Sequence, residues 1–275
     1  FRNNLFRMDI CMIAVDESHC ISQWGYDFRP SYLKISEIRD LLQRTPVLAL
    51  TATATPEVVD DIQEKLKFKE KNVFRKTFLR KNLSYLVRRT DDKIEYIKRI
   101  LDSQQGQGSS IVYVRSRKLT EEIAARLNSL GISAESYHAG LEARVKDEKQ
   151  NKWKNGSVRV IVATNAFGMG IDKGDVRTVI HYNMPENLEA YFQEAGRAGR
   201  DEKDSFAILL YDKKDIGAFR KHLYDEFPLK DYVRIVYDEI CRYLNIPIHE
   251  GAGWNAEIDL WKFCKERNHK YERVE

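Results

Sequence analysis

The chain has 275 residues, of which 43% are hydrophobic and 32% are charged, and its formal net charge is +4. This is the composition of a soluble globular protein long enough for two domains, and its mildly basic balance permits nucleic-acid binding without demonstrating it. No apolar run approaches the ~20 residues of a membrane-spanning helix, so we expect no membrane partner. The four cysteines are scattered without a C-x-x-C pair, which predicts reduced thiols and a cytoplasmic, nucleoid-associated protein.

The first predicted strand leads directly into two acidic residues. Residues 10–15 form an unbroken apolar run, typical of a parallel strand covered on both faces, and Asp16 and Glu17 follow it. Ligands bind at the carboxyl ends of such strands, so these acids are placed to hold a hydrated Mg²⁺ and to polarise a water against a phosphate. The alternative for so short a motif is a solvated acidic turn.

The flanking residues favour the Mg²⁺ site over a solvated acidic turn. Asp-Glu-Ser-His at 16–19, followed by Cys-Ile-Ser-Gln-Trp-Gly-Tyr-Asp-Phe-Arg-Pro at 20–30, closely resembles the Walker B segment and aromatic-rich loop of RecQ-family DNA helicases. This resemblance implies ATP as substrate, with Asp16 on Mg²⁺ through water, Glu17 activating the attacking water, and His19 joining the ATP site to the loop. Later segments continue the resemblance in the family's order.

In that family the aromatic-rich loop senses single-stranded DNA. The residues that match it are Gln23, Trp24, Phe28 and Arg29. Stacking of a base on an aromatic ring is worth ~1–3 kcal/mol, which makes the rings candidate DNA contacts. The alternative is that the two aromatic side chains pack under the loop, but their polar neighbours favour DNA.

A helix is predicted over residues 31–43 and a strand over 46–50. The Thr-Ala-Thr-Ala-Thr segment that follows, at 51–55, resembles the family's motif III. Thr55 before a proline is a good helix cap. Thr51 and Thr53 are the candidates for linking the acidic pair or bound phosphate to DNA through short hydrogen bonds.

The chain becomes basic and loses periodicity over residues 75–82, where it resembles the start of the family's second RecA-like domain. Lys81 stands where an Arg-Pro-Asn motif commonly has proline. After it, strands and helices alternate, which predicts a parallel sheet with crossover helices. The predicted strands are 111–114, 134–137, 158–163, 176–182 and 206–211, and the predicted helices are 91–103, 118–130, 141–153 and 189–200.

The expected fold class is therefore α/β. We expect RecA-like parallel sheets, with part of a first lobe at 1–75 and a complete second lobe at 76–212. A helical extension is predicted at 213–275.

Two loops at strand ends of the second lobe are candidate binding sites. Arg115 and Ser116 resemble motif IV and can hold phosphates of the DNA backbone, although Ser116 is equally suited to cap the following helix.

The second loop, at 162–172, resembles motif V. Its Thr164 can donate to a DNA phosphate, and Gly168 and Gly170 allow the backbone to approach a nucleotide phosphate. Asp172 could bind a ribose hydroxyl or a partner arginine.

Residues 193–201, Gln-Glu-Ala-Gly-Arg-Ala-Gly-Arg-Asp, match motif VI. The spacing of Gln193, Arg197 and Arg200 predicts one helix face directed at bound nucleotide. By resemblance the two arginines are arginine fingers, and such a residue is worth ~10³ or more in rate. The alternative is a salt-bridged surface helix, which the two glycines disfavour because each costs ~1 kcal/mol in a helix.

The region after residue 212 reads as helices over 213–224, 230–244 and 258–267. Many family members carry four zinc-binding cysteines here. The available residues, Cys241, His249, Cys264 and His269, lack the close ligand pair of structural zinc sites, so zinc is not expected.

The resemblance implies 3′ to 5′ translocation on single-stranded DNA and unwinding of partially duplex DNA in repair and recombination. The sequence contains no G-x-x-x-x-G-K-[ST] phosphate-binding loop, so we expect a piece of a longer helicase that cannot hydrolyse ATP alone. The alternative is a non-catalytic nucleic-acid-binding relative, which would need neither the acidic pair nor the two arginines. A DEAD-box RNA helicase is disfavoured by the loop around Trp24.

Overall fold

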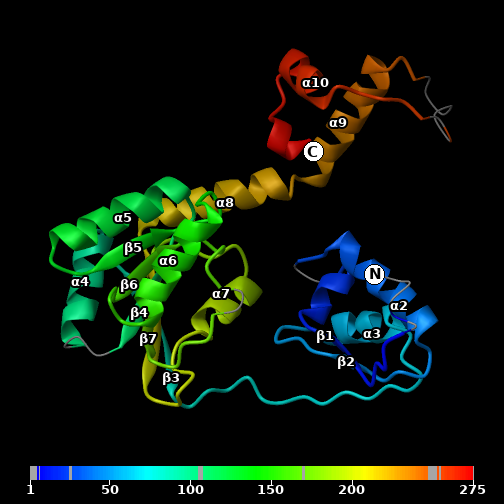
Figure 1. The fold of residues 1–275 in the computed structure, drawn as a ribbon. Coiled ribbons are helices and arrows are strands. Elements are labelled where there is room, and N and C mark those ends of the chain that lie inside the picture. The colour runs from blue at the N-terminus through cyan, green and yellow to red at the C-terminus, as the bar shows by residue number, and fades with distance from the viewer. Residues whose placement is uncertain are drawn as a thin grey trace.

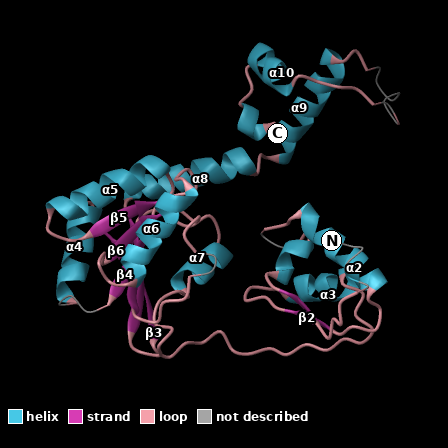
Figure 2. Cartoon of the chain, in the orientation of Figure 1, coloured by secondary structure: helices cyan, strands magenta, loops and turns pink. Residues whose placement is uncertain are grey.

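The computed structural model describes residues 5, 7–24, 27–104, 108–168, 171–246, 253 and 255–274. They form a first lobe around two short strands, a second lobe around a six-stranded sheet, and a helical extension (Figure 1). The segment 69–82, which joins the lobes, contains neither helix nor strand and runs as an extended loop (Figure 2). Of the helices in the described ranges, none is both long and apolar enough to cross a membrane.

The first lobe is built on a parallel pair of strands in which Ile13 lies opposite Val47. The apolar side of the third helix packs on these strands through Val58 and Ile62. The Thr55 hydroxyl accepts a hydrogen bond from the Val58 amide at 3.4 Å, so the predicted cap is confirmed. The elements are β1 (Ile13–Val15), η1 (Ser18–Ile21), η2 (Pro30–Lys34), α2 (Ile35–Leu41), β2 (Val47–Ala49) and α3 (Pro56–Lys65).

Two predictions for this lobe differ from the structure in detail. The strand predicted over residues 10–15 begins only at Ile13. The helix predicted over 31–43 is a 3₁₀ turn followed by an α-helix that ends at Leu41, an arrangement common at helix starts.

The second lobe contains a six-stranded, wholly parallel sheet in the order β3-β8-β7-β4-β6-β5. Its strands are β3 (Leu83–Arg89), β4 (Ser109–Tyr113), β5 (Ala134–Tyr137), β6 (Val160–Ala163), β7 (Val176–His181) and β8 (Ser205–Tyr211). The helices between them are α4 (Lys93–Ser103), α5 (Arg117–Ser129), α6 (Ala143–Lys154) and α7 (Leu188–Ala195). The predicted α/β class is confirmed.

Both faces of this sheet are covered. On β4, Ile111 and Tyr113 lie in one buried cluster with Trp153 of α6 and Ala195 of α7. Val112, between them, lies in a second cluster with α4 and α5. This alternation follows from the period of two along a strand, and it explains why the central strands are apolar at every position.

The strand β3 is absent from the sequence-based prediction. It lies at the edge of the sheet, paired only with β8, and most of its side chains are exposed. Its last two residues, Arg88 and Arg89, give it the composition of a basic loop. An edge strand with a solvated face lacks the apolar run that marks the central strands.

The helical extension comprises α8 (Lys213–Glu226), α9 (Lys230–Tyr243), α10 (Leu260–Arg267) and η3 (Tyr271–Arg273). Lys93 of α4 anchors its start, donating to Asp215 and to the Tyr182 carbonyl, each at 2.5 Å. Figure 1 shows α8 leading away from the second lobe toward α9 and α10.

Two of the residues considered for zinc in this extension, His269 and Cys264, have protein contacts. Both ring nitrogens of His269 have protein partners, the Tyr232 hydroxyl at 3.0 Å and Glu239 at 2.8 Å. Cys264 is buried in a small core with Val236. His249 lies outside the described residues.

Candidate active site

The acidic pair lies on a sharp turn at the end of β1. Asp16 is exposed, and its carboxylate accepts a hydrogen bond from the Glu17 amide at 2.9 Å. Glu17 has a left-handed backbone, with φ of 48°. A non-glycine residue in this region is strained, and such strain is concentrated at functional sites. The turn leaves Glu17 partly covered while its neighbour faces solvent.

His19 connects this turn to the end of β2. Its Nδ1 lies 3.0 Å from Thr51 Oγ1 and 3.4 Å from Glu17 Oε2. The two segments meet because β1 and β2 are neighbouring parallel strands, whose carboxyl ends lie at one edge. Burial lowers the pKa of His19 below its usual value of 6.5, with Glu17 opposing that shift. The imidazole is therefore neutral near pH 7.

The aromatic-rich loop is closed by a hydrogen bond from the Arg29 amide to the Cys20 carbonyl at 2.8 Å. Trp24 is 78% exposed, so it does not pack under the loop. Phe28 and Arg29 are half-buried, and Arg29 forms an ion pair with Asp27 at 2.5 Å, which holds the pKa of that carboxyl below its usual range. Gln23, the residue before Trp24, is also exposed.

The helix predicted over 189–200 is wrong at its end. The helix α7 stops at Ala195, and Gly199 has a left-handed φ of 62°. Gln193 therefore lies on the helix, whereas Arg197 and Arg200 lie on the turns that follow, not on one helix face. Gly196, at the end of α7, is still right-handed, and the left-handed Gly199 turns the chain between the two arginines.

The two arginines are held by the motif V loop. Arg197 donates to the Gly168 carbonyl at 2.5 Å. Arg200 donates to the Ile171 carbonyl at 2.9 Å and lies 3.3 Å from Asp172. Asp172 therefore has an arginine as its neighbour.

Gly168 makes room for this contact. A Cβ at that position would lie 2.2 Å from Nη2 of Arg197. The missing side chain thus admits a guanidinium from the neighbouring loop, a reason that the sequence pattern did not reveal. Gly170, the other glycine considered for phosphate, lies outside the described residues.

One hydrogen bond links the two lobes at the acidic pair. Gln193 Nε2 donates to Glu17 Oε1 at 3.4 Å. Beside it, a cavity of about 370 Å³ is lined from both sides, by Thr53 of the first lobe, Phe78 of the linker, and Leu188 and Phe192 of α7. Gln193, the first residue of the motif VI segment, therefore contacts the acidic turn.

The sequence reasoning missed two residues that support this segment. Arg80 donates to the carbonyls of Gly196 and Gly199, the first at 2.9 Å. Asn82 donates to the carbonyls of Gly199 and Lys203 at 2.8 and 2.9 Å. Both belong to the Arg-Lys-Asn segment that resembles the family's Arg-Pro-Asn, a pattern that in the sequence indicates only a domain boundary.

The candidate DNA-contacting residues of the second lobe divide into two environments. Arg115 and Thr164 line one cavity of about 240 Å³, together with Asn183 and His181. Ser116 is absent from that lining. Its hydroxyl accepts from the Leu119 amide at 3.2 Å and caps α5.

Comparison with known proteins is consistent with this geometry. Residues 92–202 match the model of the helicase conserved C-terminal domain. The chain is 40% identical over 273 residues to the ATP-dependent DNA helicase RecQ of Haemophilus influenzae, covering 96% of this chain and 44% of that protein. It is 43% identical over 210 residues to RecQ of Bacillus subtilis, covering 76% and 35%. The chain spans less than half the length of these relatives.

Solved structures with a similar fold include two helicase-type proteins. Dbp5 of S. cerevisiae bound to RNA and ADP BeF3 has a TM-score of 0.60 and 20% identity, covering 82% of this chain and 61% of that chain. The helicase Lhr of Mycobacterium smegmatis bound to ssDNA and AMP-PNP has a TM-score of 0.58 and 23% identity, covering 72% and 28%. These likenesses show the RecA-like fold alone.

Proposed function

The chain belongs to the RecQ family of DNA helicases, and on that premise we propose that it forms part of an ATP-driven motor. The motor would move 3′ to 5′ along single-stranded DNA and unwind partially duplex DNA. Its setting would be DNA repair and recombination in the cytoplasm, at the nucleoid.

The hydrogen bond between Gln193 and Glu17 is the observation that carries this proposal. It joins the helix that precedes the two arginines to the acid that would activate water. In ATP-driven motors the nucleotide lies between such groups, so that one lobe supplies the base and the other neutralises the transferred phosphate. A protein that only bound nucleic acid would have no need to join them.

The acidic turn fits a hydrated Mg²⁺ ion. Asp16 offers an exposed carboxylate, and Mg²⁺ prefers oxygen ligands while keeping several of its waters. When bound, Mg²⁺ would neutralise charge on the phosphates. Glu17 would accept the proton of the attacking water, and its carboxylate is already oriented by Gln193 and His19 at 3.4 Å each.

Arg197 and Arg200 would exchange partners when ATP binds. Arg197 now donates to a backbone carbonyl of the motif V loop, and Arg200 donates to another carbonyl there and pairs with Asp172. Phosphate offers arginine an opposite charge and a bidentate acceptor, which a backbone carbonyl does not, and this favours the exchange. Gln193 and the loop residues Gly168, Gly170 and Asp172 would complete the nucleotide site.

DNA would be held by both lobes. In the first, Gln23, Trp24, Phe28 and Arg29 would contact single-stranded DNA, with the exposed indole stacking on a base. Thr51 would transmit the contact to the acidic pair, since it already touches His19; Thr53 would assist. In the second lobe, Arg115, Ser116 and Thr164 would bind backbone phosphates.

We also propose that the 275-residue chain does not hydrolyse ATP by itself. It contains no G-x-x-x-x-G-K-[ST] loop, which in this class of enzymes holds the β- and γ-phosphates. Turnover by this chain with single-stranded DNA present would contradict that.

The decisive experiment measures ATP hydrolysis by the full-length protein with and without single-stranded DNA. We expect DNA to stimulate hydrolysis and Glu17→Gln to abolish it while DNA binding persists. Glu148→Gln, on the solvent side of α6, is the matched control and should retain activity. DNA binding without any hydrolysis would instead support the non-catalytic relative.

A further inference from the structure

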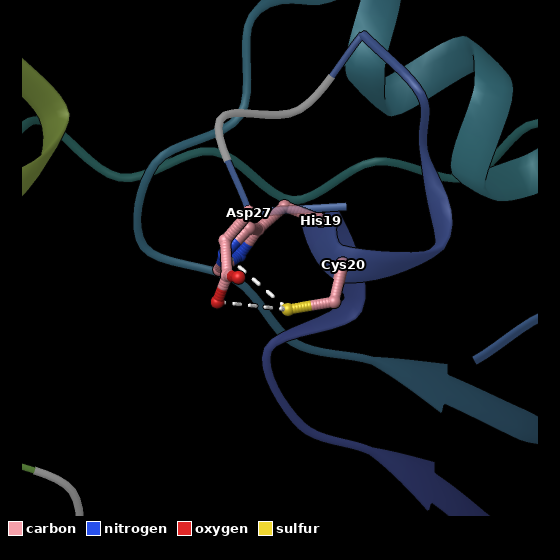
Figure 3. A group of neighbouring side chains, drawn as sticks. All are labelled: His19, Cys20 and Asp27. Carbon is pink, nitrogen blue, oxygen red and sulfur yellow. Dashed lines mark hydrogen bonds between the residues drawn. The ribbon is translucent and has the colours of Figure 1, made fainter. Parts of the chain in front are cut away.

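Three side chains of different chemistry converge beneath the aromatic-rich loop. His19 and Cys20 are buried on η1, and Asp27 reaches them from the far end of the loop. Their ligand atoms lie within 4.8 Å of one another, and among the described residues no other group of three such side chains does so. Figure 3 shows the Cys20 sulfur facing both the carboxylate and the imidazole.

We propose that His19, Cys20 and Asp27 bind a borderline-soft divalent cation of the Zn²⁺ class. Zinc bonds of about 2.0–2.1 Å to nitrogen and about 2.3 Å to sulfur, at a tetrahedral angle, place those two ligand atoms roughly 3.6 Å apart. The Cys20 sulfur lies 3.7 Å from His19 Nε2 and 3.7 Å from Asp27 Oδ2. Two of the three tetrahedral edges are therefore already close to their final length.

The surroundings of His19 suit a metal ligand. Its Nδ1 lies 3.0 Å from Thr51 Oγ1 and 3.4 Å from Glu17 Oε2, two oxygens that can both accept when Nδ1 carries the hydrogen. The lone pair then belongs to Nε2, the nitrogen that faces the thiol. Histidine ligands are usually fixed in this way, by a second partner on the other ring nitrogen.

The ligand set discriminates between cations. Thiolate and imidazole favour zinc, whereas magnesium takes oxygen ligands, so this site is distinct from the one proposed at Asp16. A cysteine binds zinc as the thiolate, so binding should release about one proton per ion. Arg29 now pairs with Oδ2 of Asp27, the oxygen that faces Cys20, so it would have to move to Oδ1 when the ion binds.

Occupation of the site would tie both ends of the loop together. Cys20 precedes Trp24, and Asp27 follows it, so one ion would fix the segment that carries the exposed indole. The ion would thereby restrain the loop without occupying either candidate substrate site.

The test titrates Zn²⁺ into the 275-residue chain by calorimetry, in buffers of different ionisation enthalpy, without ATP or DNA. We expect one ion per chain and release of about one proton. With Co²⁺ as probe, a sulfur-to-cobalt charge-transfer absorption should appear. Because neither substrate is present, this experiment and the hydrolysis experiment can fail separately.

Variants locate the ion. Cys20→Ser should lower the affinity for Zn²⁺ by at least about 100-fold and remove the cobalt absorption, since it removes a direct ligand. Cys11→Ser and Cys264→Ser are the matched controls and should bind as the parent does. Circular dichroism checks that each variant folds. If Cys20→Ser unfolds, the test uses Asp27→Asn instead, because Asp27 is only half-buried. Absence of stoichiometric binding, or equal binding by the folded Cys20→Ser or Asp27→Asn chain, would overturn the proposal.

Discussion

Arg80 donates a hydrogen bond to the backbone carbonyl of Gly196 at 2.9 Å, and so ties the end of the interlobe linker to the turn that carries Arg197. The same guanidinium donates to the carbonyl of Gly199, so both ends of that turn are held. A movement of the linker would therefore be transmitted to the candidate arginine fingers through a side chain that contacts neither nucleotide nor DNA.

Arg80→Ala should lower kcat for ATP hydrolysis by the full-length protein by about tenfold or more, with KM for ATP changed far less. The reason is that the turn loses its support, not its nucleotide-binding groups. Arg80→Lys should restore activity only in part, because an ammonium lacks the planar fork that reaches two carbonyls. Steady-state kinetics on both variants, with Arg99→Ala on the surface of α4 as control, checks this. A rise in KM at unchanged kcat would contradict it.

Gly168→Ala should displace the guanidinium of Arg197, which lies 2.2 Å from the position of the new Cβ. Because the displaced group is the end of a flexible side chain, we expect a loss of about 1 kcal/mol or less in stability. Hydrolysis by the full-length protein should nevertheless fall by about tenfold or more. The matched control is Gly217→Ala in α8, which has open space around it and should stabilise the helix by roughly 0.5–1 kcal/mol. Unchanged activity of Gly168→Ala would show that hydrolysis does not depend on the space that Gly168 leaves for Arg197.

Gly199→Ala should destabilise the chain more than Gly131→Ala. Both glycines have positive φ, 62° and 79°, so each alanine carries a left-handed penalty of about 1–2 kcal/mol. Only at Gly199 would the Cβ also meet Asn82 Nδ2 and Ser205 Oγ, each at 2.7 Å. We expect this crowding to cost about 1–3 kcal/mol more. Urea denaturation of both variants measures the difference, and equal losses would show that the turn relaxes freely.

The buried His19 should make the free energy of unfolding of the chain depend on pH. Its pKa is lower in the folded state than the unfolded value of about 6.5, so the unfolded chain binds this proton first as the pH falls. The free energy of unfolding should therefore decrease from pH 7 toward pH 5. His19→Gln should flatten this part of the profile, and His222→Gln, at an exposed site on α8, should not. Thermal denaturation over that pH range distinguishes the two.

Much of the second lobe could be predicted from the chain itself. Its central strands are apolar at every position because helices cover both faces of the sheet, and such runs are visible without any tertiary information. Helix caps such as Thr55 could also be predicted from the sequence, because the capping hydrogen bond joins residues only three positions apart. The edge strand β3 was not, since one of its faces remains in solvent.

Most of the candidate site residues came from the motifs, but their arrangement did not. The spacing of Arg197 and Arg200 predicts a single helix face, whereas α7 ends at Ala195 and a left-handed Gly199 separates the two arginines. The sequence predicts that Gly168 lets the backbone approach a phosphate. In the structure Gly168 instead makes room for Arg197, which comes from a separate loop.

The sequence by itself determined the residue types at the ends of the strands, because hydrophobic periodicity and local turn chemistry depend only on near neighbours. The tertiary structure alone decided that Gln193 meets Glu17 and that Arg80 supports the turn after α7. These pairs are separated by more than a hundred residues. Their contact arises from how the lobes and linker pack, and local sequence patterns do not predict contacts between residues so far apart in the chain.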